Sequence, residues 1–389
     1  MKRSLILAAA FLFCTGAMAF ADEEAEVYRQ IYMQAEGLSQ KYAAVVNLAG
    51  LNDKSSAPVL SDALRDLLAT QNSYRSPSEK ELYARTVRVV SAALGSYKYV
   101  DAASSLWDVV QQVPDPLARS EAIMALGSMR ALDYSERISL LLQNLDIAPS
   151  NDRDSDEKVA YGCIIALQKL KDPRGFAPVF YAADGWYTQR VRQTALAALP
   201  NIAVDPTDPI KEIIRTEGPD RKLLALRQNA ISGATPARKS EAALLALALG
   251  QTQASRDKSE ERTMAELRKL ALRSLVSFKS AGADSVAADQ HSYDNGYDDE
   301  ERLLALQALG ANGSDEAAAS LREIILELDR DQRSGVTDET RNRMAKAAIE
   351  NAALTKNKAV KPALIAVSLN DKWSGGIILA AQNAVKAMP

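Results

Sequence analysis

The sequence has few of the residues that most often carry out chemistry. Its 389 residues include one histidine, His291, two cysteines and 6% aromatic residues. It contains no glycine-rich phosphate loop, no Ser-His-Asp motif and no spaced Cys-His cluster. We therefore predict no catalytic residues, no cofactor and no metal site, and hence that the chain is not an enzyme.

Long hydrophobic runs are also lacking. After residue 21 no run approaches the roughly 20 apolar residues that span a bilayer. Residues 1–21 combine Lys2 and Arg3, a short apolar stretch and small residues at cleavage spacing, as a signal peptide does. We predict cleavage after Ala21 and an exported protein, periplasmic or secreted. Lipidation of Cys14 is disfavoured but stays open, because Phe13 stands where a lipobox has a small residue.

An excess of positive charge is absent as well. The chain has 47 basic and 50 acidic residues and a formal net charge of −3. Nucleic acids are bound chiefly through clustered Lys and Arg, so this balance argues against a nucleic-acid partner.

Removal of the leader leaves Cys163 as the remaining cysteine, so no internal disulfide can form. Its place on an apolar helix face predicts a small buried side chain.

What the chain does contain is an Ala-Leu-Gly signature that recurs with weaker copies every 31 to 45 residues. This spacing is typical of two-helix solenoid repeats. We predict an all-α fold, an α-solenoid (superhelix) of about nine stacked antiparallel helix pairs. The signature begins at residues 93, 125 and 308, and the weaker copies begin at 166, 198, 230, 274, 353 and 384.

Apolar residues at helical spacing mark one buried stripe in each helix that carries the signature, for example Val159, Cys163, Leu167 and Leu170. No segment alternates apolar and polar residues, so we predict no sheet. Residues 22–48 read as one long helix that covers the end of the stack. The expected organisation is a signal peptide at 1–21, an N-terminal helical cap at 22–78 and a solenoid at 79–389. Second helices are predicted at 173–183, 208–216, 236–250, 314–328 and 358–369.

Residues 166–178 read ALQKLKDPRGFAP, and Arg190-Val191-Arg192 opens the next helix. These segments resemble HEAT repeats, in particular the HEAT-like repeats of phycobilisome lyases. The resemblance covers roughly residues 79–388 and implies a HEAT/armadillo-like fold, with Asp172 and Arg192 pairing between neighbouring repeats. A HEAT-type hydroxylase binds iron through repeated His-Glu pairs, which this chain lacks, and bilin lyases do not suit an exported chain.

Two acidic clusters stand out. Asp152 begins a run of alternating carboxylates, but a calcium loop needs glycine at its sixth position and glutamate at its twelfth, where Glu157 and Cys163 stand. Helix capping explains this run better, and calcium binding stays an alternative. The second cluster runs from Asp289 to Glu301, and we predict it as a loop that ends in an acidic helix start.

Insertions are predicted near residues 150–157, 252–262, 329–340 and 289–301, all on the edge of the stack where a solenoid often binds its partner. We predict a protein-protein interaction scaffold or adaptor in the cell envelope or periplasm, with a protein partner. A ligand- or metal-responsive enzyme or regulatory subunit that uses the acidic loops is the alternative. Self-association through the apolar C-terminal helix also stays open. The candidate partner-binding residues are His291, Tyr293, Asp294, Tyr297, Asp298 and Asp299.

Overall fold

A computed structural model describes residues 24–280 and 282–388 of the chain. These residues form α-helices and short 3-10 turns, and no strand occurs in either range. The predicted all-α solenoid of stacked helix pairs is therefore confirmed. The predicted signal peptide and Cys14 lie outside the described residues. The chain divides into two compact units, with unit 1 ending at Ala203 and unit 2 beginning at Val204.

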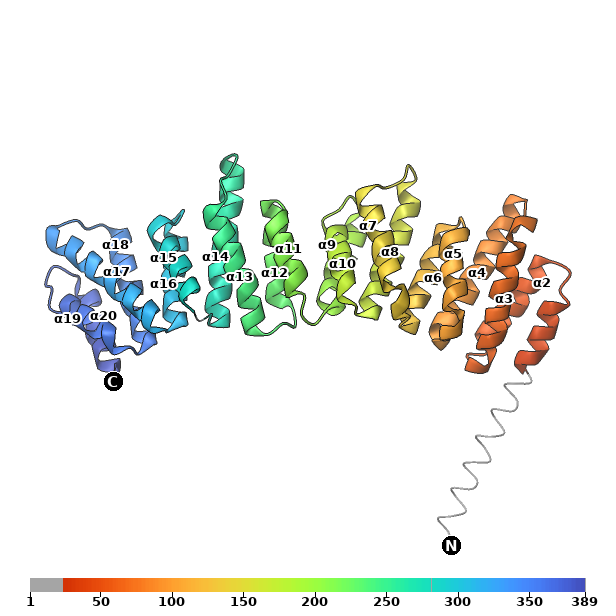
Figure 1. Ribbon diagram of the computed structural model, residues 1–389, viewed down its shortest axis with the longest axis horizontal. Helices are drawn as coiled ribbons and strands as arrows, with labels where there is room; N and C mark the ends of the chain where they lie inside the picture. Colours follow the sequence, from red (N-terminus) through yellow and green to blue (C-terminus); the bar gives the residue numbers. More distant parts are fainter. Residues whose placement is uncertain (1–23, 281, 389) are drawn as a thin grey trace, which may run out of the picture. The chain divides into compact units, whose positions relative to one another are not determined.

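In each unit, anchor helices alternate with second helices (Figure 1). The helices of unit 1 are an unlabelled first helix at 24–33, the anchor helices α2 (Leu38–Gly50), α4 (Pro77–Tyr97), α6 (Pro116–Met129), α8 (Arg153–Leu170) and α10 (Gln189–Ile202), and the second helices α3 (Ala57–Thr70), α5 (Ala103–Gln112), α7 (Ser135–Ile147) and α9 (Phe176–Ala183).

Unit 2 continues the alternation and starts with a second helix. Its second helices are α11 (Thr207–Thr216), α13 (Pro236–Thr252), α15 (Ala283–Asn295), α17 (Asp315–Ser334) and α19 (Lys361–Ser368), and its anchor helices are α12 (Pro219–Ile231), α14 (Lys258–Phe278), α16 (Asp299–Asn312), α18 (Glu339–Thr355) and α20 (Gly375–Ala387).

The Ala-Leu-Gly signature is the contact between successive anchor helices. Anchor helices pack against the next anchor helix in line, as α4 does on α6 and α6 on α8. A Cβ atom added to Gly95 would lie 2.8 Å from the Cα of Ala125, and one added to Gly127 would lie 2.5 Å from the Cα of Ala166. Only glycine allows this approach, so Gly95 and Gly127 each receive the alanine of the next copy, whereas Gly310 lies against Asn351 of α18.

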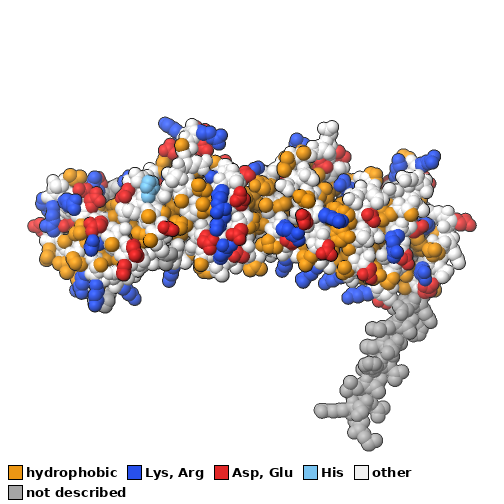
Figure 2. Space-filling model, viewed as in Figure 1, with side chains coloured by type: hydrophobic (Ala, Val, Ile, Leu, Met, Phe, Trp, Pro, Cys, Tyr) orange, Lys and Arg blue, Asp and Glu red, His pale blue; other side chains and the backbone are white. Residues whose placement is uncertain are grey.

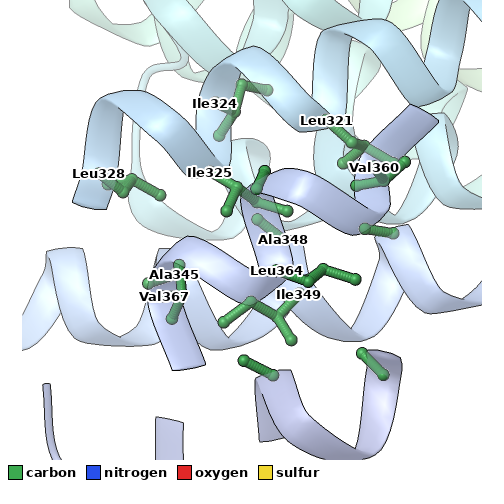
Figure 3. Close-up of a cluster of buried hydrophobic side chains, with 14 of the residues drawn as sticks. Leu321, Ile324, Ile325, Leu328, Ala345, Ala348, Ile349, Val360, Leu364 and Val367 are labelled. Carbon is green, nitrogen blue, oxygen red and sulfur yellow. The ribbon is translucent and has the colours of Figure 1, made fainter. Parts of the chain in front are cut away.

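The core of unit 2 shows how the apolar stripes meet. Leu321, Ile324, Ile325 and Leu328 follow helical spacing on α17 and are buried. Figure 3 shows Leu321 and Ile325 facing side chains of α18, of α19 and of the 3-10 turn that precedes α19. Burying a leucine or isoleucine side chain contributes roughly 1.5–3 kcal/mol, so these stripes hold the stack together. The facing residues are Ala345, Ala348, Ile349, Val360, Leu364 and Val367.

The single long helix predicted at 22–48 is wrong. The described part of this segment forms two helices, 24–33 and α2, separated by residues 34–37. Gly37 adopts an extended conformation before α2, and the side chain of Gln40 accepts a hydrogen bond from the backbone N–H of Glu36. Glycine is a poor helix former, and this local hydrogen bond stabilises a turn where the helix would otherwise continue.

The predicted insertions are mostly helix rather than loop. Helix α7 ends at Ile147 and α8 begins at Arg153, so residues 148–152 form that connection. Residues 253–257 join α13 to α14, residues 335–338 join α17 to α18, and residues 296–298 join α15 to α16. The extra sequence therefore lengthens the flanking helices. The ends of the helices together with these connections from second to anchor helices form what we call the junction edge of each unit.

Candidate partner-binding site

The predicted site residues of unit 2 lie at the junction edge, but on a helix rather than in a loop. His291, Tyr293 and Asp294 belong to the last turns of α15, and Asp299 is the first residue of α16. The predicted loop from Asp289 is therefore wrong, whereas the predicted acidic helix start is confirmed, because Asp298 caps α16 and its first turn is acidic. The many polar residues of this segment obscured its helical pattern. Its buried side chains nevertheless follow Val286 at helical spacing.

Three of the six predicted residues are exposed. His291 and Asp294 are exposed on α15, and the side chain of Tyr297 is 46% exposed in the connection that follows. Figure 2 shows the side chain of the chain's one histidine at the surface. Asp294 accepts a hydrogen bond from Gln290 on its own helix, at 3.0 Å. These three side chains can therefore reach another molecule.

The other three predicted residues take part in the fold. Tyr293 packs against the apolar core of unit 2, and burial raises the pKa of its hydroxyl to about 12. Asp298 caps α16 by accepting the backbone N–H of Glu301 at 2.9 Å, and it also accepts from the Lys269 ammonium at 3.1 Å. A cap of this kind stabilises a helix by about 1 kcal/mol.

Asp299 ties two anchor helices together. Its carboxylate accepts a hydrogen bond from the Thr340 hydroxyl at 3.0 Å and another from the Arg343 guanidinium, both on α18. The sequence analysis predicted that this carboxylate contacts another protein. In the structure it binds side chains of α18 in the same unit, because α16 packs on α18.

The implied Asp172–Arg192 pair does not form. Asp172 accepts two hydrogen bonds from the side chain of Arg174, at 3.0 and 2.7 Å, and also caps the turn that precedes α9. Arg174 also reaches Glu136 on α7 at 3.1 Å. The Arg174 guanidinium is the main cause that lowers the pKa of the Asp172 carboxyl. Neighbouring second helices are thus linked, but through a different arginine.

The carboxylates of the first acidic cluster already bind groups close to them in the sequence. Asp152 caps α8 by accepting the backbone N–H of Ser155 at 3.2 Å, and Asp156 accepts the backbone N–H of Ser150 at 2.5 Å. Asp154 pairs with Lys158 one turn along the helix. Among the described residues, no group of three or more His, Cys, Asp or Glu side chains is arranged to hold a metal ion.

Sequence reasoning missed a buried carboxyl beside the predicted site. Asp289 on α15 is fully buried; one carboxyl oxygen lacks a hydrogen-bond partner, and the other lies 3.4 Å from the Ser285 hydroxyl. Burial raises the pKa of this carboxyl to about 8. Val286 and Asp289 stand three residues apart on one helix face, which is the signal that could have revealed its position.

Unit 1 has a pocket at its own junction edge. The pocket, of about 670 Å³, lies between the α3–α4 connection, the first half of α4 and the α5–α6 connection. Its lining includes the side chains of Tyr83 and Arg88. A concave site with apolar walls and a few polar groups is the usual form of a ligand-binding site. The sequence gave no sign of this pocket.

Comparison with known proteins gives little further information. No family model matches the chain, and no curated protein matches it. A search of solved structures finds human deoxyhypusine hydroxylase in complex with glycerol, at 17% sequence identity and a TM-score of 0.29, over 96% of this chain and 98% of that chain. The helix pairs of this chain are consistent with a HEAT-like fold, and membership of a particular family is not shown.

This comparison corrects one prediction. We inferred from the missing motifs that the chain is not an enzyme, but the matched protein is an enzyme. We therefore do not retain the prediction. With a TM-score of 0.29, the match transfers no residue, reaction or substrate to this chain.

No helix in the described ranges is both long and apolar enough to cross a membrane.

Proposed function

We propose that this protein is a scaffold or adaptor that binds another protein in the cell envelope or periplasm. The observation that carries the proposal is the set of exposed side chains at the junction edge of unit 2. His291, Asp294 and Tyr297 are exposed, whereas Tyr293, Asp298 and Asp299 beside them are used by the fold. The fold thus rigidly supports three side chains that it does not need for its own packing.

The chemistry of these three side chains suits a protein partner. Tyrosine contributes a large, rigid and amphipathic contact, and it is enriched among the residues that dominate interface energies. The imidazole and the carboxylate beside it offer directional polar contacts at the rim. Because α15 packs on both α16 and α17, the backbone that presents them is held on two sides.

Export is part of the proposal. It rests on the leader-like pattern of residues 1–21 in the sequence. The partner is then another exported protein or the outward part of a membrane protein.

The proposal is tested by cross-linking in cells followed by mass spectrometry of the captured proteins. The variant replaces His291, Asp294 and Tyr297 together with alanine and leaves the buried side chains untouched. We expect loss of the cross-linked partner with no more than a small change in melting temperature. Alanine in place of Glu316 and Glu323, which are exposed on α17 away from the 329–340 segment, provides a surface control. Equal capture by wild type and both variants would contradict the proposal.

A further inference from the structure

The pocket of unit 1 contains an arginine that is poorly engaged by the protein itself. The side chain of Arg88 is 31% exposed and lines the pocket. Its Nε atom lies 3.4 Å from the carbonyl oxygen of Ala84 and 4.0 Å from the nearest carboxylate oxygen, that of Asp115. A guanidinium forms its strongest pairs at 2.7–2.9 Å with two parallel hydrogen bonds. Arg88 therefore has donors left for a second anion.

Asp115 does not supply that stronger pair in the structure. Its carboxylate is the N-cap of α6 and accepts the backbone N–H of Ala118 at 2.7 Å. The same oxygen, Oδ1, lies 4.0 Å from Arg88, so it serves the cap, which typically contributes about 1 kcal/mol to helix stability, and does not form a close ion pair. The carboxylate thus stays at the pocket wall while the guanidinium remains only loosely paired.

An aromatic wall lies beside the arginine. The rings of Tyr74 and Tyr83 are 5.4 Å apart between centroids, and both line the pocket together with Val113 and Pro114. Tyr83 is 6% exposed, and its hydroxyl has no hydrogen-bond partner. An unpaired buried polar group costs about 1–3 kcal/mol, and a ligand group that reached this hydroxyl would recover part of that cost.

The charges of the lining limit the class of ligand. Arg75, Lys80 and Arg88 exceed Glu81 and Asp115 by one positive charge. A singly charged anion balances this excess, whereas a doubly charged phosphate overshoots it. Apolar walls beside one charged group match an apolar side chain that lies next to a carboxylate, which is the chemistry at the end of a peptide chain.

We propose that this pocket binds a carboxylate next to an apolar or aromatic side chain, supplied by a peptide segment of the protein partner. Arg88 binds the carboxylate, and the wall of Tyr74, Tyr83, Val113 and Pro114 receives the neighbouring side chain. The inference rests on the proposed protein-binding function and assigns a second contact site, in unit 1, to it.

The probes are three pools of synthetic hexapeptides, equilibrated with the purified full chain and analysed by mass spectrometry of the retained fraction. The first pool has no acidic side chain and a free carboxyl terminus. The second is identical but amidated. The third is amidated and carries one glutamate at a varied position. We expect retention of the first pool enriched in apolar and aromatic last residues, and no retention of the second.

The third pool distinguishes the two sources of the carboxylate. If the third pool is retained and the first is not, the pocket still binds a carboxylate beside an apolar side chain, and that carboxylate comes from a side chain. Equal retention of the second pool would overturn the proposal, because no carboxylate would then be required.

Two variants locate the binding. R88Q should lower retention at least tenfold, whereas R85Q, which removes the same charge from α4 outside the pocket lining, should leave it unchanged. R88K keeps the charge without the planar fork and should retain part of the binding. If R88Q and R85Q behave alike, the pocket is not the site.

Y83F provides a check that does not depend on a charged residue. Removal of a buried hydroxyl without a partner should leave the melting temperature equal or higher. Retention of the peptides should fall several-fold if the ligand reaches that hydroxyl, and unchanged retention would contradict the role given to it. If the wild-type chain retains none of the three peptide pools while cross-linking through unit 2 persists, this inference alone is refuted and the proposed function stands.

Discussion

A single glycine sets the distance between two anchor helices in unit 1. At Gly127 an added methyl group would fall 2.5 Å from the Cα and 2.9 Å from the Cβ of Ala166, and both atoms belong to a packed helix. Backbone cannot yield as a flexible side chain does, so the two helices would have to move apart. The small residues of the repeat signature therefore act through their size, which allows the anchor helices to approach closely.

The first prediction follows from this contact. G127A should destabilise the protein by about 1–3 kcal/mol, because overpacking outweighs the gain of roughly 1 kcal/mol in helix propensity. The measurement is urea unfolding followed by circular dichroism. G50A serves as the control, because nothing lies within 4 Å of a methyl group added at Gly50 on α2. A stabilised G127A would show that the close approach is not real.

Buried ionisable groups make stability depend on pH. The folded state holds a proton on Asp289 up to about pH 8, whereas an unfolded aspartate loses it near pH 4. Between these values the folded state binds more protons than the unfolded state. Stability therefore falls as pH rises through this window, and the penalty is fully present above pH 8.

The second prediction is that D289N removes this loss. The variant should gain stability over wild type by up to about 1.4 kcal/mol for each pH unit between pH 5 and pH 8, since an amide stays neutral throughout. Denaturant unfolding of both proteins at several pH values measures the difference. D294N changes an exposed carboxyl on the same helix and is the control; because it keeps Asp289, it should retain the fall in stability with pH. A constant stability difference between D289N and wild type would mean that the buried carboxyl is already ionised at pH 5.

At the scale of an element, one carboxylate fixes the last helices of unit 2. Asp329 on α17 is buried and accepts hydrogen bonds from Asn370 at 2.7 Å, from the Trp373 indole at 2.9 Å and from Arg333 at 2.9 Å. Asn370 and Trp373 lie in the segment between α19 and α20. The carboxylate therefore holds the connection that positions α20.

The third prediction concerns this network. D329A leaves two buried donors unpaired and should cost about 2–4 kcal/mol. Amide hydrogen exchange should show the largest loss of protection in α19 and α20. E323A on the exposed side of the same helix should cost no more than about 0.5 kcal/mol. Uniform loss of protection over unit 2 would contradict a local role.

The fourth prediction tests the acidic cluster at the α7–α8 connection. Asp152 and Asp156 accept backbone hydrogen bonds, and Asp154 pairs with Lys158. Millimolar calcium should therefore leave the melting temperature unchanged, since a ligand stabilises a folded state only if it binds there. An upward shift that D152N abolishes would restore the calcium alternative.

The sequence predicts elements better than it predicts sites. Apolar spacing and capping residues mark most helices, because these signals act within a few residues. Ser76 and Glu79, for example, form a capping box at the start of α4. The polar stretch of α15 misled the prediction because its apolar side contributes few residues. Pairing partners such as Thr340 for Asp299 are distant in sequence, and a pattern within one segment cannot reveal them.

At the scale of the whole molecule, the fifth prediction concerns export. We expect the mature protein to begin at Asp22, since the small residues around Ala21 fit the cleavage site of a signal peptide. N-terminal sequencing of protein from the envelope fraction tests this. Retention of residues 1–21 on protein found inside the cell would contradict the proposed compartment.

We propose that the junction edges of the stacked helix pairs in the two units bind another protein. This proposal is tested most directly by placing a photo-cross-linking amino acid, one site at a time, in the full chain in cells. The sites are His291, Tyr297 and Asn72 at the junction edge, and Lys98 and Lys356 where anchor helices turn into second helices. We expect cross-links to a protein from the first three sites and none from the last two. Equal cross-linking from both groups, or cross-links from Lys98 and Lys356 alone, would contradict it.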